Sequence, residues 1–122
     1  MMKPKNGVRV EPWRIRYEGA ADAAAESIFF TGNGFLGVRG YPAWQEKEQL
    51  QAHAVFRAGL FEEIKPGVTD MVQLPDALML LTEAAPKSAA LSLDLRRGVV
   101  TQEYADADAS VQVERMVSMA DP

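Results

Sequence analysis

The sequence predicts an all-β protein, an antiparallel β-sandwich with little helix. Several short segments alternate between apolar and polar side chains, which is the period of a strand that buries one face. Turns rich in glycine and proline separate these segments. The alanine-rich stretch at residues 19–25 suffices for about one helical turn, which is too short to be stable by itself. These three observations favour packed sheets over a helical fold.

The stretch from residue 26 to residue 40 is the centre of the predicted fold. Its two apolar runs, residues 28–31 and 35–38, flank a Gly-Asn-Gly sequence at residues 32–34. Glycine and asparagine reach positive φ at little cost, so we expect a tight hairpin here. Two more glycines lie in or just after the second strand, where they indicate a bulge or the close approach of another backbone: Gly37 and Gly40. The pattern alone indicates a packed β-corner and no reaction.

We assign residues 1–10 to a mobile N-terminal lead-in and residues 11–122 to one β-sandwich domain. A strand is expected after Pro12, with faces of opposite character. Its apolar face carries Trp13, Ile15 and Tyr17, and its charged face carries Arg14 and Arg16. For the two arginines we favour a solvated strand face over a binding patch.

Further strands are expected where side chains alternate or form short apolar runs, at residues 52–61, 77–82, 91–95, 99–104 and 110–119. Loops or turns are expected between them, at residues 43–51 (with partial helicity), 62–67, 83–90, 96–98 and 106–108, and residues 68–76 are expected to be extended and irregular. Arg115 interrupts the apolar face of the last strand. We expect it either to reach solvent or to pair with a carboxylate.

Composition excludes several functional classes. The net charge of −4 and the pI near 5.0 disfavour binding to nucleic acid or to anionic lipid. The absence of cysteine excludes disulfides and thiolate metal sites. The polar N-terminus lacks the apolar core of a signal peptide, and no apolar run approaches the ~20 residues of a membrane helix. We therefore expect a cytoplasmic protein with no membrane partner.

Few side chains are candidates for chemistry, and each has a simpler structural explanation. The single histidine, His53, lies near no recognisable nucleophile motif, so a surface or cross-strand role is favoured. Asp106 and Asp108 could hold a hard cation, but aspartate is a common turn residue. Glu62 and Glu63 are adjacent and would point to opposite faces of a strand, so they are poor candidates for a facing acid/base pair.

Aromatic side chains could stack on a sugar ring, although a place in the core is favoured for them. They are Trp13, Phe29, Phe30, Phe35 and Trp44. The glycine-rich stretch does not match a phosphate-binding loop, because a strand and not a helix is expected after it.

Residues 26–40, read as Glu-Ser-Ile-Phe-Phe-Thr-Gly-Asn-Gly-Phe-Leu-Gly-Val-Arg-Gly, resemble the motif near the start of glycoside hydrolase family 65. That family contains the maltose, trehalose and kojibiose phosphorylases and related hydrolases. Other segments follow in family order, so that the resemblance covers roughly residues 11–119: residues 13–17, 56–61, 74–76, 93–95, 98–100 and 113–118.

The resemblance implies a galactose-mutarotase-like N-terminal β-sandwich, joined by a linker to an (α/α)6 barrel that carries the catalytic glutamate. In the phosphorylases that glutamate protonates the glycosidic oxygen while phosphate attacks the anomeric carbon with inversion. No position here matches the glutamate or the phosphate-binding segment, so we expect no catalytic, cofactor-binding or metal-ligating residue in this chain. Inorganic phosphate would be a co-substrate of the parent enzyme if that enzyme is a phosphorylase.

The chain ends just after its most regular predicted strand, so we expect a fragment with about half of the usual sandwich and with unpaired strand edges. Its expected partners are the barrel of the same polypeptide, a second copy of the chain and, through the parent enzyme, an α-linked glucose disaccharide. The alternative is a free-standing carbohydrate-binding or protein-interaction module.

Overall fold

The protein is built from two antiparallel sheets and one short helix within the part of the chain that the computed structural model describes, residues 7–19, 23–40, 55–75, 88–105 and 108–120. The larger sheet has five strands in the order β1-β2-β7-β8-β9, and the smaller has four in the order β3-β4-β5-β6. The predicted all-β sandwich with little helix is thus confirmed. No helix in these ranges is long and apolar enough to span a bilayer.

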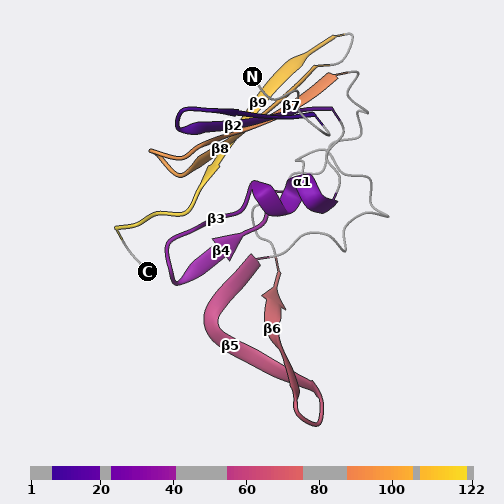
Figure 1. Cartoon of the computed structure of the whole chain (residues 1–122), viewed down its shortest axis with the longest axis vertical. Helices are drawn as coiled ribbons and strands as arrows, with labels where there is room; N and C mark the ends of the chain where they lie inside the picture. Colours follow the sequence, from indigo (N-terminus) through magenta and orange to yellow (C-terminus); the bar gives the residue numbers. More distant parts are fainter. Residues whose placement is uncertain (1–6, 20–22, 41–54, 76–87, 106–107, 121–122) are drawn as a thin grey trace.

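The large sheet combines the two ends of the chain. Its strands are β1 (Val8–Glu11), β2 (Arg14–Glu18), β7 (Ser88–Asp94), β8 (Val99–Ala105) and β9 (Ser110–Met116). Strand β2 pairs directly with β7 although about seventy residues separate them along the chain. Figure 1 shows this sheet at the top of the molecule, with α1 and the smaller sheet on one side of it.

The core lies on the side of the large sheet that faces α1. Register places Ile15 beside Leu93 and Leu93 beside Val100, so apolar side chains form a continuous row across three strands. Phe29 follows α1 directly and packs against this row with no exposed surface. At ~25 cal/mol per Å² of buried apolar area, one such aromatic side chain contributes several kcal/mol.

The smaller sheet begins under the core and ends far from it. Its elements follow α1 (Ala23–Ile28) as β3 (Thr31–Gly32), β4 (Leu36–Val38), β5 (Val55–Lys65) and β6 (Val68–Leu74). Strand β5 bends, and the hairpin that it forms with β6 extends away from the rest of the molecule (Figure 1). A hydrogen bond ties the start of the sheet to the chain beyond β9, from the Asn33 amide to the Ser118 carbonyl (2.7 Å).

The N-terminal region differs from the prediction in two ways. Val8–Glu11 forms strand β1, where only a lead-in was expected, because Val8 and Val10 alternate with polar residues and pair with β2. Trp13 is not on the apolar face of a strand. It lies in the Pro12-Trp13 turn, where its side chain is 57% exposed and its φ is 66°.

The central hairpin forms as expected but is shorter. Ile28 belongs to α1 and not to a strand, and only Thr31–Gly32 pairs with Leu36–Val38. The helix extends further than the alanine-rich stretch indicated, so the expected strand at residues 28–31 is wrong over most of its length.

Strand lengths also differ in the second half of the chain. Residues 62–65, three of them charged, continue β5, and residues 68–74 form the regular strand β6 where an irregular stretch was expected. Cross-strand pairing explains both differences, since each exposed segment completes the hydrogen bonds of the other. Strand β7 begins at Ser88, inside the expected loop. The turns at residues 66–67 and 96–98 are confirmed.

Some expectations fall outside the described residues. These are the loop at 43–51, the strand at 77–82, and the side chains of Trp44, His53 and Asp106. Within the described residues, the open edges of the two sheets are β1 and β9, and β3 and β6, so the expectation of unpaired edges holds there.

Candidate functional site

Two regions could carry a function: the motif at residues 26–40 and a polar hollow on the large sheet. In the motif, the carboxylate of Glu26 is buried beside the Arg39 guanidinium, with 3.5 Å between Oε2 and Nε. Arg39 also donates from Nη2 to the Ser27 hydroxyl (3.2 Å), and the Gly40 amide donates to the Glu26 carbonyl (3.1 Å). These contacts tie the start of the motif to its end.

Asn33 shapes the turn between β3 and β4. Its Oδ1 accepts hydrogen bonds from the backbone amides of Phe35 (2.9 Å) and Leu36 (2.8 Å), which is the geometry of an Asx turn. Gly34 has a φ of 85°, as the Gly-Asn-Gly pattern predicted. The asparagine therefore uses both of its polar atoms within the fold, counting its contact with Ser118.

The two later glycines of the motif give room to aromatic neighbours. A Cβ atom at Gly37 would overlap the ring of Phe30, and one at Gly40 would overlap the carbonyl of Phe29. The predicted close approach of another backbone is confirmed at Gly40, whereas at Gly37 the approaching group is the ring of Phe30. The glycines of the motif and its contacts among Glu26, Arg39 and Asn33 thus serve packing.

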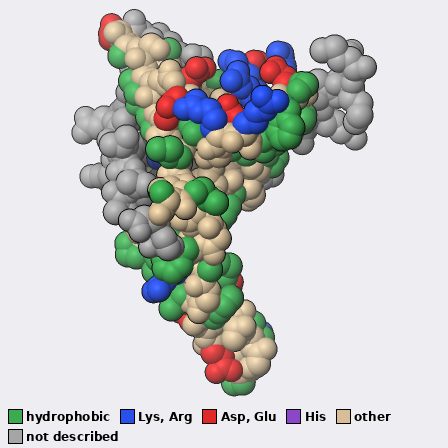
Figure 2. Space-filling model, turned by 90° about the vertical axis from the view of Figure 1, so that its left-hand side faces the viewer, with side chains coloured by type: hydrophobic (Ala, Val, Ile, Leu, Met, Phe, Trp, Pro, Cys, Tyr) green, Lys and Arg blue, Asp and Glu red, His purple; other side chains and the backbone are tan. Residues whose placement is uncertain are grey.

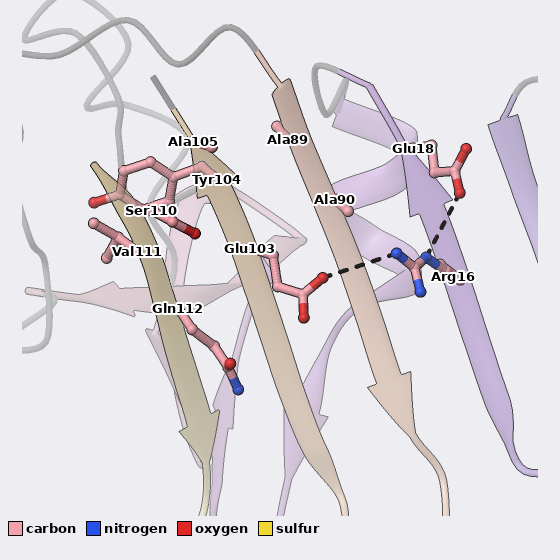
Figure 3. A pocket seen from close by; sticks show the side chains of 10 residues that line it. All are labelled: Arg16, Glu18, Ala89, Ala90, Glu103, Tyr104, Ala105, Ser110, Val111 and Gln112. Carbon is pink, nitrogen blue, oxygen red and sulfur yellow. Dashed lines mark ion pairs between the residues drawn. The ribbon is translucent and has the colours of Figure 1, made fainter. Parts of the chain in front are cut away.

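The second region is a hollow of ≈ 480 Å³ on the large sheet. Strands β2, β7, β8 and β9 line it, and Figure 3 shows its side chains: Arg16, Glu18, Ala89, Ala90, Glu103, Tyr104, Ala105, Ser110, Val111 and Gln112. Its volume is within the range of about 300–1,000 Å³ that is typical of small-molecule sites.

Strand register explains why the surface is hollowed there. Glu18 pairs with Ala90, Ala90 pairs with Glu103, and Glu103 pairs with Gln112, so one row crosses four strands. Ala90 carries only a methyl group, while its neighbours on both sides are long. The two glutamates face each other over this gap from strands that are two positions apart, about 10 Å in a sheet.

Arg16 reaches into the gap from the next row and lies between the two carboxylates (Figure 3). Its Nε is 3.7 Å from Glu18 Oε1, and its Nη2 is 3.8 Å from Glu103 Oε2. Both distances exceed the 2.7–2.9 Å or so of a charge-assisted hydrogen bond. The Nε atom is buried and has no hydrogen-bond acceptor among the described residues. The hollow therefore combines a guanidinium with two carboxylate acceptors.

Charged groups elsewhere on this face are mixed in sign. Arg9 approaches Glu18 at 3.9 Å, and Figure 2 shows acidic and basic side chains gathered together near the top of the molecule. Such exposed pairs contribute only about 0–1 kcal/mol each. The charged face predicted for Arg14 and Arg16 is present, with Arg14 exposed and Arg16 half-buried. The described residues contain no group of His, Asp and Glu that could hold a metal ion.

Most candidates from the sequence lie apart from the hollow. Glu62 and Glu63 are exposed on β5, and Asp108 is exposed before β9. Arg115 is buried on the core side of the large sheet, where it pairs in register with Val100.

The aromatic candidates divide between core and surface. Phe29 is in the core as expected, while Phe30 is partly exposed and stacks against Phe56 with 6.5 Å between ring centroids. The Arg57 guanidinium lies 4.7 Å from the centre of the Phe35 ring. For Trp13 the core interpretation is wrong, since its side chain is exposed and the Arg96 guanidinium lies 5.0 Å from the centre of its ring.

Sequence reasoning missed Glu18, Glu103 and Gln112. Alternation places Glu103 on the polar face of its strand, and this was the one available signal. It does not reveal that β7 joins β2 to β8, and this pairing brings Glu18 and Glu103 to either side of Ala90.

The fold and the motif define an antiparallel β-sandwich domain whose central hairpin is held by internal contacts. The family model "Glycosyl hydrolase family 65, N-terminal domain" matches residues 15–122. The chain belongs to this family, which confirms the resemblance read from residues 26–40. A comparison with curated proteins gives no match for this sequence.

Proposed function

We propose that this chain is the non-catalytic N-terminal β-sandwich of an inverting α-glucoside phosphorylase or hydrolase. In this role it braces an (α/α)6 catalytic barrel of the same polypeptide and shapes the mouth of the barrel's active site. The observation that carries the proposal is the family match over residues 15–122, together with a motif whose contacts among Glu26, Arg39 and Asn33 serve packing.

The chemistry of an inverting enzyme explains why we assign the catalytic residues to the barrel and not to this domain. A general acid must protonate the glycosidic oxygen while phosphate or water attacks the anomeric carbon from the opposite face, so that the C–O bond breaks with inversion. The buried Glu26 faces Arg39 and cannot reach a substrate, and the exposed Glu62 and Glu63 lie on an open hairpin. We therefore place the acid in the barrel.

Apolar side chains are exposed on the β5–β6 hairpin, and this supports the proposal that another protein surface covers it. Phe61 and Ile64 are 59% and 62% exposed, and Val68 and Met71 are also exposed. Phe61 pairs with Met71 in register, and neighbouring exposed apolar side chains of this kind are typical of an interaction site. A barrel from the same polypeptide or a second copy of the chain would cover it, and a cytoplasmic location suits a protein without cysteine.

The test is to sequence the gene downstream of the codon for Pro122, to express the protein that the whole reading frame encodes, and to assay it in parallel with the 122-residue chain. We expect the longer protein to release glucose 1-phosphate or glucose from maltose, trehalose or kojibiose, and the short chain to release neither. Turnover by the short chain alone, or a reading frame that encodes no barrel, would contradict the proposal.

A free-standing carbohydrate-binding module is the second candidate, and the polar hollow on the large sheet favours it. The two candidates differ in whether a barrel accompanies the domain, so the same reading frame separates them.

A further inference from the structure

We propose that the hollow lined by Arg16, Glu18 and Glu103 binds a neutral polyhydroxylated ligand, specifically one pyranose unit of an oligosaccharide. This assignment goes beyond the bracing role, because a domain that only supports a barrel needs no ligand site on this sheet. It depends on the composition, charge and register of the hollow.

The hydrogen-bonding groups of the hollow require a ligand with both donors and acceptors. The Arg16 guanidinium lies 3.7 Å from Glu18 through Nε and 3.8 Å from Glu103 through Nη2, so both carboxylates remain able to accept further hydrogen bonds. A sugar hydroxyl donates and accepts at the same atom, so neighbouring hydroxyls can satisfy the guanidinium and a carboxylate together. Gln112 and Ser110 add groups that also donate and accept.

The charge of the hollow favours a neutral ligand. Arg9 approaches Glu18 at 3.9 Å, and Arg16 lies between Glu18 and Glu103 (Figure 3), so two guanidiniums balance two carboxylates. The formal charge is zero, and the hollow offers no net attraction to a phosphate or to a cation.

The shape of the hollow suits a flat ring. Ala90 contributes only a methyl group, and longer side chains on β2, β8 and β9 stand around it. This methyl group can contact the C–H face of a pyranose while the equatorial hydroxyls of the ring point outward to the polar rim. The hollow is open to solvent, so we expect weak binding, with a Kd on the order of millimolar.

The test is a titration of the ¹⁵N-labelled 122-residue chain with maltose, followed through amide chemical shifts. We expect saturable shifts centred on residues 16–18, 89–90, 103–105 and 110–112. Inorganic phosphate should cause no saturable shift at these amides.

Three variants make the test specific. Glu103→Ala removes one acceptor, and Ala90→Leu fills the gap without changing charge. Each should weaken maltose binding by about tenfold or more, the usual effect of losing a hydrogen bond to a charged group or of blocking a site. Glu62→Ala makes the same charge change on the distant β5 and should bind maltose as the parent does.

The proposal is overturned if maltose gives no saturable shifts or if the shifts map elsewhere. It is also overturned if Glu62→Ala weakens binding as much as Glu103→Ala, or if phosphate saturates the same amides. A failed titration leaves the bracing role standing, because turnover by the longer protein tests that role independently.

Discussion

The large sheet and the β5–β6 hairpin are both antiparallel, yet they differ in what covers them. On the large sheet, Leu91 and Val100 are almost fully buried beneath Phe29. On the hairpin, Phe61 and Ile64 have most of their surface exposed although the strands pair over a similar length. Backbone pairing is thus common to both regions, and only the first has a face removed from water. Since an isolated two-stranded hairpin is marginally stable at best, we expect the large sheet to carry the stability of the chain.

The largest contrast should come from truncating one phenylalanine in each region. Phe29→Ala removes a fully buried ring and should lower the free energy of unfolding by about 3–5 kcal/mol. Phe61→Ala should change it by only about 0.5 kcal/mol, as for other exposed positions. Urea unfolding followed by circular dichroism measures both. Equal losses would show that the hairpin is covered in solution.

Substitution of Gly34 in the central turn should cause the next largest loss of stability. Gly34→Val forces a β-branched side chain to a φ of 85°, and we expect a loss of about 1–2 kcal/mol or more. Gly34→Asn is the matched control and should cost less, because asparagine tolerates this region. If valine and asparagine have the same melting temperature as the parent, the turn does not depend on positive φ.

The exposed hairpin should make the isolated chain self-associate. We expect the average mass from light scattering to rise with protein concentration, because Phe61 and Met71 are register partners with exposed side chains beside the open edge strand β6. Phe61→Lys should suppress this rise, whereas Val10→Lys, the same charge change on the large sheet, should leave it in place. A monomer at all concentrations would count against an apolar docking surface on the hairpin.

Replacement of Trp13 should have the smallest effect on stability. Trp13→Gly relieves a bulky residue in the left-handed region and loses the stacking of Arg96, and each change is worth about 1 kcal/mol. The two nearly cancel, so the urea midpoint should move little. A loss as large as that of Phe29→Ala would mean that Trp13 is buried in solution.

Local pattern was informative wherever one face of a segment is buried. Alternation placed Ile15 and Tyr17 on the core face and Arg14 and Arg16 on the charged face, and the structure agrees. It failed for Trp13, because a turn and not a strand determines where that side chain points. It also missed β6, an edge strand that pairs with β5.

The sequence by itself determined the all-β class, the glycine-hinged central turn and the family, because these depend on neighbours within a few residues of each other. Only the tertiary structure decided that β7 lies between β2 and β8. That long-range pairing places Ala90 between Glu18 and Glu103 and creates the hollow. Strand order depends on which apolar faces can be buried together, and it cannot be predicted from the local periodicity of each strand.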